Sequence, residues 1–321
     1  MRPAGGSPAA EARFVRLLPS REAPCGFSAL GDVERELKVK YKEHVPHVSL
    51  QDHVRCFWIM EREYTPEHPA EDVTPDAFIE LILNFGDPYV LHAEGLPDRE
   101  MPRAILVGLQ QKPLFFRCRG TVKLVATRFY AWGALPFLAD RARGLNNLGT
   151  TLGRQWDNLV RKVEPAVLAD DYDGAVSIVE DHLIERLLTA TVDLKKIKAA
   201  ARMLHLQKGQ FRVAELAEHC NLSSRQLQRQ FQDAVGVSPK TLARAIRFEE
   251  IRKRLMFDPD QSLTMLAHDY GYTDQAHFIH DFRGFADRTP GAFAREMRAI
   301  QGIFRDHDNV VFLQVPSRGR S

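Results

Sequence analysis

The feature that most constrains this chain is a sequence pattern that occurs twice towards its C-terminal end. Residues 213–242 read VAELAEHCNLSSRQLQRQFQDAVGVSPKTL, and residues 263–293 read LTMLAHDYGYTDQAHFIHDFRGFADRTPGAF. The matched apolar and turn positions are Leu216 with Leu266, Ala217 with Ala267, Leu222 with Tyr272, Leu227 with Phe278, Phe231 with Phe282, and Pro239 with Pro290. The offset between the copies is 50 residues in the first half of the pattern and 51 in the second half. A slip of one residue, confined to the turn between the halves, indicates a duplicated unit.

Each copy predicts a short helix, a tight turn and a second helix with one polar face. In the first copy Ser223 is a favourable helix N-cap, and Gln226 three residues later completes the spacing of a capping box. Leu227 and Phe231 lie four residues apart and mark the buried side of the helix that starts there. The long polar side chains of the opposite side are Arg225, Gln228, Arg229 and Gln232. Side chains of these types read base edges, because Arg pairs bidentately with guanine and Gln with adenine in the major groove of DNA.

The second copy has the same plan with weaker donors. Asp274 is the expected N-cap of its second helix, and Phe278 and Phe282 are the expected buried anchors. Its exposed polar positions are Gln275, His277, His280 and Arg283. By alignment of the copies, Ala276 stands where the first copy has Arg225, and His280 stands where it has Arg229.

A continuous stretch, residues 240–256, joins the two copies and contains neither Gly nor Pro. Leu242, Ile246, Ile251 and Leu255 fall near one side of it, which predicts one rigid helix that fixes the two units relative to each other. A single helix-turn-helix pattern is often only packing within an all-helical domain. Two copies at a fixed spacing argue against that interpretation.

The stretch from about Leu194 to Phe293 resembles the DNA-binding domain of the AraC/XylS family of bacterial transcription regulators. The residues that carry the resemblance are Ala217, Phe231, Pro239, Gly271, Phe278, Phe282 and Pro290. The resemblance implies that the two motifs enter successive major grooves on one face of the duplex. The base-reading positions it implies are Arg225, Gln228 and Arg229 in the first motif and Gln275, Ala276 and His280 in the second, and Ser224, His277 and Arg283 complete the predicted set of DNA contacts. Because Ala276 and His280 replace the long polar or basic side chains often found there, we expect the second motif to contact mainly the DNA backbone.

Charge is distributed unevenly along the 321 residues. The whole chain carries a formal charge of +2, but residues 195–300 hold 18 Lys and Arg against 12 Asp and Glu, so the remainder is acidic. A basic excess confined to the duplicated region fits a phosphate-binding module attached to a near-neutral second domain. The sequence shows no signal peptide, no apolar run of ~18 residues and no paired-cysteine motif. We therefore expect a cytoplasmic protein whose cysteines, Cys25, Cys56, Cys118 and Cys220, are reduced.

Short apolar runs separated by turn residues begin after Pro46 and predict a β-rich domain. The expected strands are residues 54–60, 77–85, 104–107, 114–118 and 122–129. In the second of these, Ile79 and Leu81 alternate with Glu80 and Ile82, which predicts one packed face and one mixed face that can line a pocket. Many AraC-type regulators carry a cupin-like β-barrel that binds a small molecule at this place, and the region is similar to such a sensor. The candidate effector-binding residues are Trp58, Glu80, Asn84, Arg128 and Trp132, each of which has an ordinary core or surface role as its alternative.

Residues 148–190 have a helical pattern. The apolar stripe of its longest segment, residues 172–188, consists of Val176, Val179, Leu183 and Leu187, widened by Ile184 and Leu188. This stripe packs either on the β-rich domain or on a second copy of the chain, and the pattern leaves both open. Residues 195–206 predict the first helix of the DNA-binding domain. Beyond Gln301 the chain holds one apolar run, residues 310–313, without a recognisable role.

The predicted fold class is α+β. The expected domains are an N-terminal, partly disordered lead (1–45), a β-rich sensor domain of cupin-like type (46–140), a helical connector or dimerisation segment (141–190), an AraC-type DNA-binding domain of seven helices (191–300) and a tail (301–321). His44, His47 and His53 are close in sequence, but no later Glu completes a metal-binding set, so we expect no metal and no other cofactor.

The expected function is that of a non-enzymatic, sequence-specific transcription regulator. Its expected partners are double-stranded promoter or operator DNA and a small-molecule effector of unknown identity, with a second copy of the chain and, for an activator, RNA polymerase as candidates. No membrane contact is expected. Two alternatives stay open: an architectural DNA binder without an effector, and a β-domain enzyme or metalloprotein tethered to DNA. No nucleophile with its base and orienting group supports the second alternative.

Overall fold

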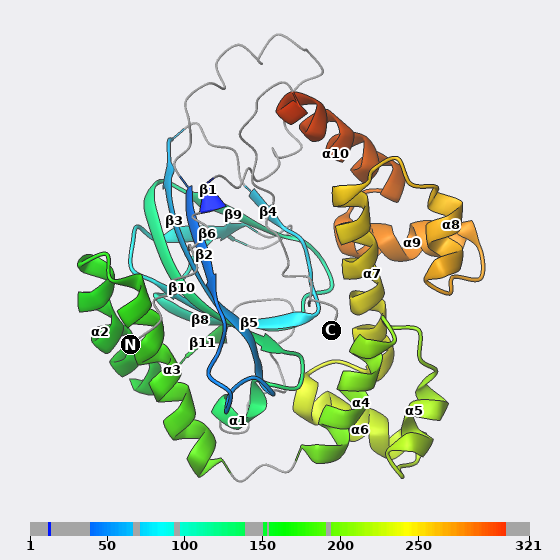
Figure 1. The fold of residues 1–321 in the computed structure, drawn as a ribbon, viewed down its shortest axis with the longest axis horizontal. Helices are drawn as coiled ribbons and strands as arrows, with labels where there is room; N and C mark the ends of the chain where they lie inside the picture. Colours follow the sequence, from blue (N-terminus) through cyan, green and yellow to red (C-terminus); the bar gives the residue numbers. More distant parts are fainter. Residues whose placement is uncertain are drawn as a thin grey trace, which may run out of the picture.

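The structure is a computed structural model that describes residues 12–13, 39–66, 71–92, 97–138, 150–152, 154–190 and 194–305. A region of β-strands with covering helices is followed along the chain by a region made only of helices, and the two lie side by side (Figure 1). The predicted apolar run at residues 310–313, most of the N-terminal lead and Cys25 lie outside the described residues. Within the described residues, none of the helices has both the length and the apolar character needed to span a membrane.

The larger sheet is antiparallel throughout and has the strand order β1-β2-β3-β10-β5-β8-β11. Its strands are β1 (Ala12–Arg13), β2 (Val39–His44), β3 (Val54–Tyr64), β5 (Phe78–Asn84), β8 (Ala104–Val107), β10 (Gly120–Tyr130) and β11 (Thr150–Thr151). Strand β10 is central and pairs along most of its length with β3 on one side and β5 on the other. The alternation predicted for β5 is confirmed, because Ile79, Leu81 and Leu83 are at most 1% exposed while Glu80 and Ile82 are partly exposed on the other face.

A smaller sheet faces the mixed side of the larger one. Its order is β4-β9-β6-β7, formed by Glu71–Val73, Leu114–Cys118, Tyr89–His92 and Arg99–Glu100 respectively. Apolar side chains of both sheets make a second core, which includes Tyr89, Leu91, Leu114, Val122 and Leu124. Among the described residues no strand of one sheet pairs with a strand of the other, so the two sheets form no closed barrel there.

Three helices cover the packed face of the larger sheet. They are α1 (Leu135–Leu138), α2 (Arg154–Leu168) and α3 (Tyr172–Thr189), seen on the left and below in Figure 1. The stripe predicted on α3 packs within its own chain, with Val179 and Leu183 at most 1% exposed. Leu188 does not belong to it and is 82% exposed. The helical pattern predicted from about residue 148 is wrong at Thr150–Thr151, which pairs with β8 because the sheet edge offers it backbone partners.

The C-terminal region consists of seven helices, as predicted. They are α4 (Lys195–Leu206), α5 (Val213–His219), α6 (Ser224–Val235), α7 (Pro239–Phe257), α8 (Leu263–Asp269), α9 (Gln275–Ala286) and α10 (Pro290–Arg305). The predicted joining helix is confirmed as α7, which runs without a break between the first helix-turn-helix (α5 and α6) and the second (α8 and α9) (Figure 1). Its Leu242, Ile246, Ile251 and Leu255 are at most 2% exposed, so both units pack against one continuous rod.

The duplication extends to the left-handed backbone positions. The turn of the first motif has Asn221 at φ 50° where the second has Gly271 at φ 69°. The end of the second helix has Gly236 at φ 83° in the first motif and Asp287 at φ 54° in the second. Asn, Asp and Gly are the residues that adopt this conformation at least cost. The same backbone path is therefore kept although the residues differ.

Candidate DNA interface and sensor-domain cluster

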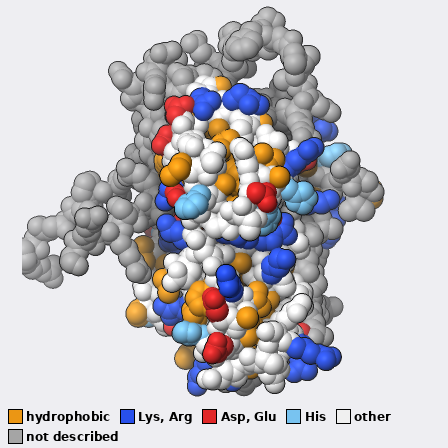
Figure 2. Space-filling model, turned by 90° about the vertical axis from the view of Figure 1, so that its right-hand side faces the viewer, with side chains coloured by type: hydrophobic (Ala, Val, Ile, Leu, Met, Phe, Trp, Pro, Cys, Tyr) orange, Lys and Arg blue, Asp and Glu red, His pale blue; other side chains and the backbone are white. Residues whose placement is uncertain are grey.

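The second helix of each motif presents a polar face to solvent over a buried apolar side. In α6, Leu227 and Phe231 are fully buried, and in α9 Phe278 and Phe282 are at most 1% exposed. The predicted DNA-contacting residues are all exposed, namely Ser224, Arg225, Gln228 and Arg229 on α6, and Gln275, Ala276, His277, His280 and Arg283 on α9. Figure 2 views the side of the molecule that carries both motifs, and Lys and Arg side chains are spread from one end of this face to the other.

Caps determine where each of these helices begins. The Ser223 hydroxyl accepts a hydrogen bond from the Gln226 backbone N–H at 3.3 Å, and the Gln226 side chain accepts one from the Ser223 backbone N–H at 2.9 Å. Asp274 Oδ1 accepts from the His277 backbone N–H at 2.7 Å. This hydrogen bond lowers the pKa of Asp274 below its usual value. Both caps agree with the sequence prediction, and each satisfies a backbone N–H in the first turn of its helix.

Helix α9 is tied to α7 by a buried ion pair that the sequence pattern did not reveal. Asp281 is 2% exposed, and its carboxylate accepts hydrogen bonds from Arg244 Nε at 2.5 Å and from the Tyr272 hydroxyl at 2.9 Å. Burial, together with the neighbouring Asp281 charge, raises the pKa of the Tyr272 hydroxyl. The Arg247 guanidinium lies 4.8 Å from the centre of the Tyr272 ring. The sequence signal that could have revealed this ion pair is the acidic Asp281 between Phe278 and Phe282 on the same helix.

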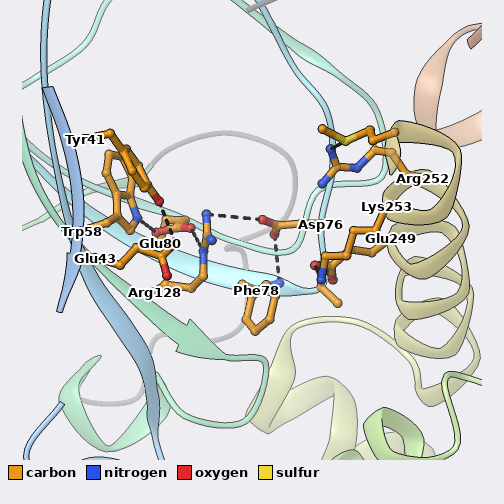
Figure 3. Close-up of polar contacts among 12 residues, drawn as sticks. Tyr41, Glu43, Trp58, Asp76, Phe78, Glu80, Arg128, Glu249, Arg252 and Lys253 are labelled. Carbon is orange, nitrogen blue, oxygen red and sulfur yellow. Dashed lines mark hydrogen bonds and ion pairs between the residues drawn. The ribbon is translucent and has the colours of Figure 1, made fainter. Parts of the chain in front are cut away.

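Three of the five predicted effector-binding residues meet on the mixed face of the larger sheet. Glu80 on β5 accepts a hydrogen bond from Trp58 Nε1 on β3 at 2.9 Å and another from Arg128 Nε on β10 at 2.6 Å (Figure 3). The Arg128 guanidinium also lies 3.9 Å from Asp76 Oδ2. The Tyr41 ring on β2 stacks on Trp58 with 6.1 Å between ring centres. We name Tyr41, Trp58, Asp76, Glu80 and Arg128 the sheet cluster.

The titration of the sheet cluster reflects burial of several charges in a small space. Burial raises the pKa of Glu80, and it raises that of Asp76 to about 7, although Arg128 opposes both shifts. Burial works against the charge of Arg128, but Glu80 and Asp76 together hold its pKa above the usual value. The cluster therefore contains a permanent cation beside two carboxylates that are reluctant to ionise.

The other two predicted effector-binding residues lie elsewhere. Asn84 is 3% exposed and closes a turn, because its amide donates to the Asp87 carbonyl at 2.8 Å and its carbonyl oxygen accepts from the Gly86 N–H at 3.0 Å. Trp132 is 4% exposed, and its ring stacks on Tyr130 with 4.7 Å between centres. Asn84 thus holds a turn, whereas Trp132 is connected to the sheet cluster through ring contacts, from Tyr130 to Phe78 and from Phe78 to Arg128.

The β-rich region contacts the helical region next to the sheet cluster. The Ala77 backbone N–H donates to Glu249 Oε2 of α7 at 3.3 Å, and the preceding residue, Asp76, accepts from the Phe78 N–H at 3.0 Å (Figure 3). Glu249 is 6% exposed and forms an ion pair with Lys253 at 2.5 Å. One short segment, residues 76–78, thus touches both the sheet cluster and the helix that joins the two motifs.

Two further contacts connect the regions. Lys198 Nζ of α4 lies 2.6 Å from an Asp52 carboxylate oxygen. The His205 ring, also on α4, packs edge-on against Trp132 with 5.4 Å between ring centres, and burial lowers the pKa of His205 to about 4. These contacts place α4 and α7 against the end of the larger sheet.

The histidines weighed as metal ligands do not converge. His44 Nδ1 lies 3.5 Å from Asp173, whereas His47 Nδ1 is hydrogen-bonded to Ser49 at 2.9 Å. His53 packs edge-on against Phe137. Within the parts of the chain that the structure describes, no group of three or more His, Cys, Asp or Glu residues is placed to hold a metal ion. Burial raises the pKa of the Cys56 thiol to about 12, which keeps it protonated and unreactive.

Comparison with known proteins matches two separate parts of the chain. Residues 216–296 match the model of a helix-turn-helix domain, and residues 42–150 match a domain of unknown function, DUF6597. The HTH-type transcriptional activator RhaS of Pectobacterium carotovorum is 35% identical over 86 residues, which are 25% of this chain and 30% of RhaS. An uncharacterised HTH-type transcriptional regulator of Haemophilus influenzae is 25% identical over 120 residues, 37% of this chain and 40% of that protein. The chain thus spans less than half the length of these relatives.

Two solved structures are also similar. ToxT from Vibrio cholerae has 12% identity and a TM-score of 0.44, with 75% of this chain and 98% of ToxT covered. An AraC-type regulator from Chromobacterium violaceum has 23% identity and a TM-score of 0.29, with 36% of this chain and 95% of that one covered.

Proposed function

Since its C-terminal domain makes this chain a member of the AraC family of helix-turn-helix transcription regulators, we propose that it binds specific DNA sequences and regulates transcription in response to a small molecule. The observation that carries the proposal is the pair of capped, polar-faced helices, α6 and α9, held on one side of the molecule by the single helix α7. The matched domain and the similarity to RhaS support a role as a transcription regulator rather than as an enzyme.

In the proposed complex the two helices enter adjacent major grooves about 34 Å apart, on one face of the duplex. Arg225 and Arg229 of α6 contact guanine, and Gln228 contacts adenine, because these side chains are long, exposed and on one side of the helix. Helix α9 supplies Gln275, His277, His280 and Arg283 beside the short Ala276. We therefore assign most of the sequence discrimination to α6 and most of the backbone grip to α9.

The β-rich region, with its two facing sheets, is the proposed sensor domain, of a cupin-like type. The sheet cluster is the proposed effector site, because it collects aromatic faces, a cation and two carboxylates on the mixed face of the larger sheet. An effector that displaces Arg128 from Asp76 alters the segment that donates to Glu249 on α7. In this way effector binding at the sheet cluster would alter the contacts of α7, the helix against which α6 and α9 pack.

The test of DNA recognition is selection of bound fragments from random duplex DNA with the full-length protein at a stated salt concentration. We expect a shared motif of two elements about ten base pairs apart. Arg225→Ala and Arg229→Ala should each weaken binding to the selected duplex by about 1–3 kcal/mol and to random DNA much less. An architectural DNA binder would lose affinity for both duplexes equally, and the absence of any shared motif would refute specific recognition.

A further inference from the structure

The two DNA-reading helices differ in how much permanent positive charge they expose. The α6 helix exposes Arg225 and Arg229, whose guanidinium groups stay charged at every physiological pH. The exposed cationic side chain of α9 is Arg283 alone, and Asp274 at its start and Asp287 at its end are exposed carboxylates. With neutral imidazoles, α9 therefore offers phosphate groups no net positive charge.

We propose that the second motif contacts DNA through protonated His277 and His280, so that binding to DNA takes up protons and strengthens as the pH falls. The inference rests on the DNA interface proposed above and adds its regulation by pH. The two histidines are three residues apart on the exposed side of α9, where they follow one another along the same face. His280 occupies the position that Arg229 has in the first motif.

Few groups of the described part of the protein contact the two rings. Among the residues that the structure describes, His280 has no hydrogen bond, ion pair or ring contact. His277 Nδ1 lies 3.4 Å from the Thr273 hydroxyl, and its ring meets the Tyr272 ring edge-on with 5.2 Å between centres. Neither histidine forms an ion pair within the described part of the chain, although the Asp274 carboxylate lies near His277.

Charged groups lie on α9 itself and on the helices packed against it. On α9 itself the relevant groups are Asp274, whose carboxylate caps the helix, and Arg283 one turn beyond His280. Charged or titratable groups on the elements around α9 include Arg244 of α7, paired with Asp281; Arg247 of α7, stacked on Tyr272; His268 of α8, 88% exposed at its side chain beside Asp269; Arg288 between α9 and α10, paired with Glu296; and Arg295 of α10. Arg244, Arg247 and Arg288 are thus engaged with groups of the protein.

The size of the effect follows from the ordinary pKa of histidine, about 6.5, which lies within the physiological range. A protonated imidazole donates from both nitrogens, so a phosphate oxygen or a guanine acceptor stabilises the charged form and raises its pKa in the complex. Each unit of that shift strengthens binding about tenfold at acidic pH relative to alkaline pH. A pKa shift of one unit in each of two histidines strengthens binding about 100-fold. Each protonated histidine that contacts a phosphate also steepens the dependence of the logarithm of the binding constant on the logarithm of salt concentration by about 0.9.

The experiment measures the affinity of the full-length protein for two duplexes of about 30 base pairs, long enough for two adjacent grooves, one selected and one random in sequence. The pH runs from about 8 to about 6 at constant ionic strength, across the titration of histidine. We expect binding to tighten by tens of fold towards the acidic end, and the double variant His277→Gln/His280→Gln to lose most of this gain. His280→Arg should bind more tightly than the unmodified protein at pH 8 by about the share of one histidine, and it should keep only the part of the pH dependence that comes from His277, because the charge at position 280 no longer titrates. His219→Gln, at an exposed histidine of the first motif, is the matched control and should keep the full pH dependence.

The two duplexes separate the sources of the acceptor. A gain of equal size on both duplexes, with a steeper salt slope at low pH, identifies phosphate contacts, whereas a gain on the selected duplex alone identifies base edges. A double glutamine variant that keeps the pH dependence of the unmodified protein overturns the inference, and so does binding without pH dependence. Failure to bind either duplex at any pH would instead refute the DNA-binding function itself.

Discussion

Removing the carboxylate of Asp281 should weaken the attachment of α9 to α7 and cost about 3 kcal/mol of stability. Asp281→Ala takes away a charge-assisted hydrogen bond from Arg244, worth about 1.5–3 kcal/mol. It also leaves the hydroxyl of Tyr272, a residue only 7% exposed, without its acceptor, at about 1–3 kcal/mol. Breaking a buried ion pair costs about 3–5 kcal/mol when the remaining charge stays dry. The Arg244 side chain is 31% exposed and can turn to water, so the loss should fall at the low end of that range.

Urea unfolding of the full-length variants measures this loss. Asp269→Asn is the matched control, because its pair with Arg254 is exposed on both sides and 4.0 Å long, and it should cost no more than about 1 kcal/mol. Combining Asp281→Ala with Tyr272→Phe should cost less than the sum of the single changes, since the two share one hydrogen bond. On DNA, footprinting should show weakened protection at the second element and retained protection at the first. A cost below about 1 kcal/mol for Asp281→Ala would refute the argued role of the pair.

Three further outcomes are expected. Ser223→Ala should lower the free energy of unfolding by about 1 kcal/mol through loss of the capping box, whereas Ser224→Ala, next to it without a cap role, should leave urea unfolding nearly unchanged. The pKa of His205 is about 4 in the folded chain against about 6.5 in the unfolded chain, so the unfolded chain takes up the proton first. The free energy of unfolding should therefore be at its full value above pH 6.5 and fall by about 2 kcal/mol on acidification to pH 5. Urea unfolding at these two pH values should show that His205→Phe removes this loss. Glu80→Gln should change DNA affinity in the otherwise unmodified protein but not in a protein that already carries Glu249→Gln. A double-mutant cycle of DNA affinities should give a coupling free energy of about 1 kcal/mol. Additive effects of the two substitutions would contradict transmission through residues 76–78.

Several features of this protein could be predicted because they depend on local sequence. The helices of the duplicated region follow from caps at Ser223 and Asp274, from apolar residues at spacings of three and four, and from an unbroken stretch over α7. The five longer or more apolar strands, β3, β5, β8, β9 and β10, follow from β-branched and aromatic runs between turn residues. Strands β2 and β6 give a weaker signal, because β2 is largely polar and β6 is only 4 residues long, so that both depend on distant backbone partners.

The sheet cluster shows where local reasoning ends. Trp58, Glu80 and Arg128 could each be named as a candidate, but their meeting depends on register, since Arg128 lies opposite Glu80 and a shift by one residue would turn it to the other face. Asn84 and Trp132 were equally good candidates by residue type, but Asn84 is hydrogen-bonded within a turn and Trp132 stacks on Tyr130. Residue type identified what these side chains can do, and strand pairing decided which of them can do it together.

What the amino-acid sequence alone determined was therefore the duplicated helix-turn-helix, its caps, its rigid joining helix and the exposed polar set of each reading helix. All of these arise from interactions between residues a few positions apart. Only the tertiary structure decided the partner of Asp281, the contact between Ala77 and Glu249, and the sheet cluster. These join residues 37, 172 and 48 positions apart for the pairs Arg244–Asp281, Ala77–Glu249 and Glu80–Arg128, and such contacts form only after packing has placed the elements side by side.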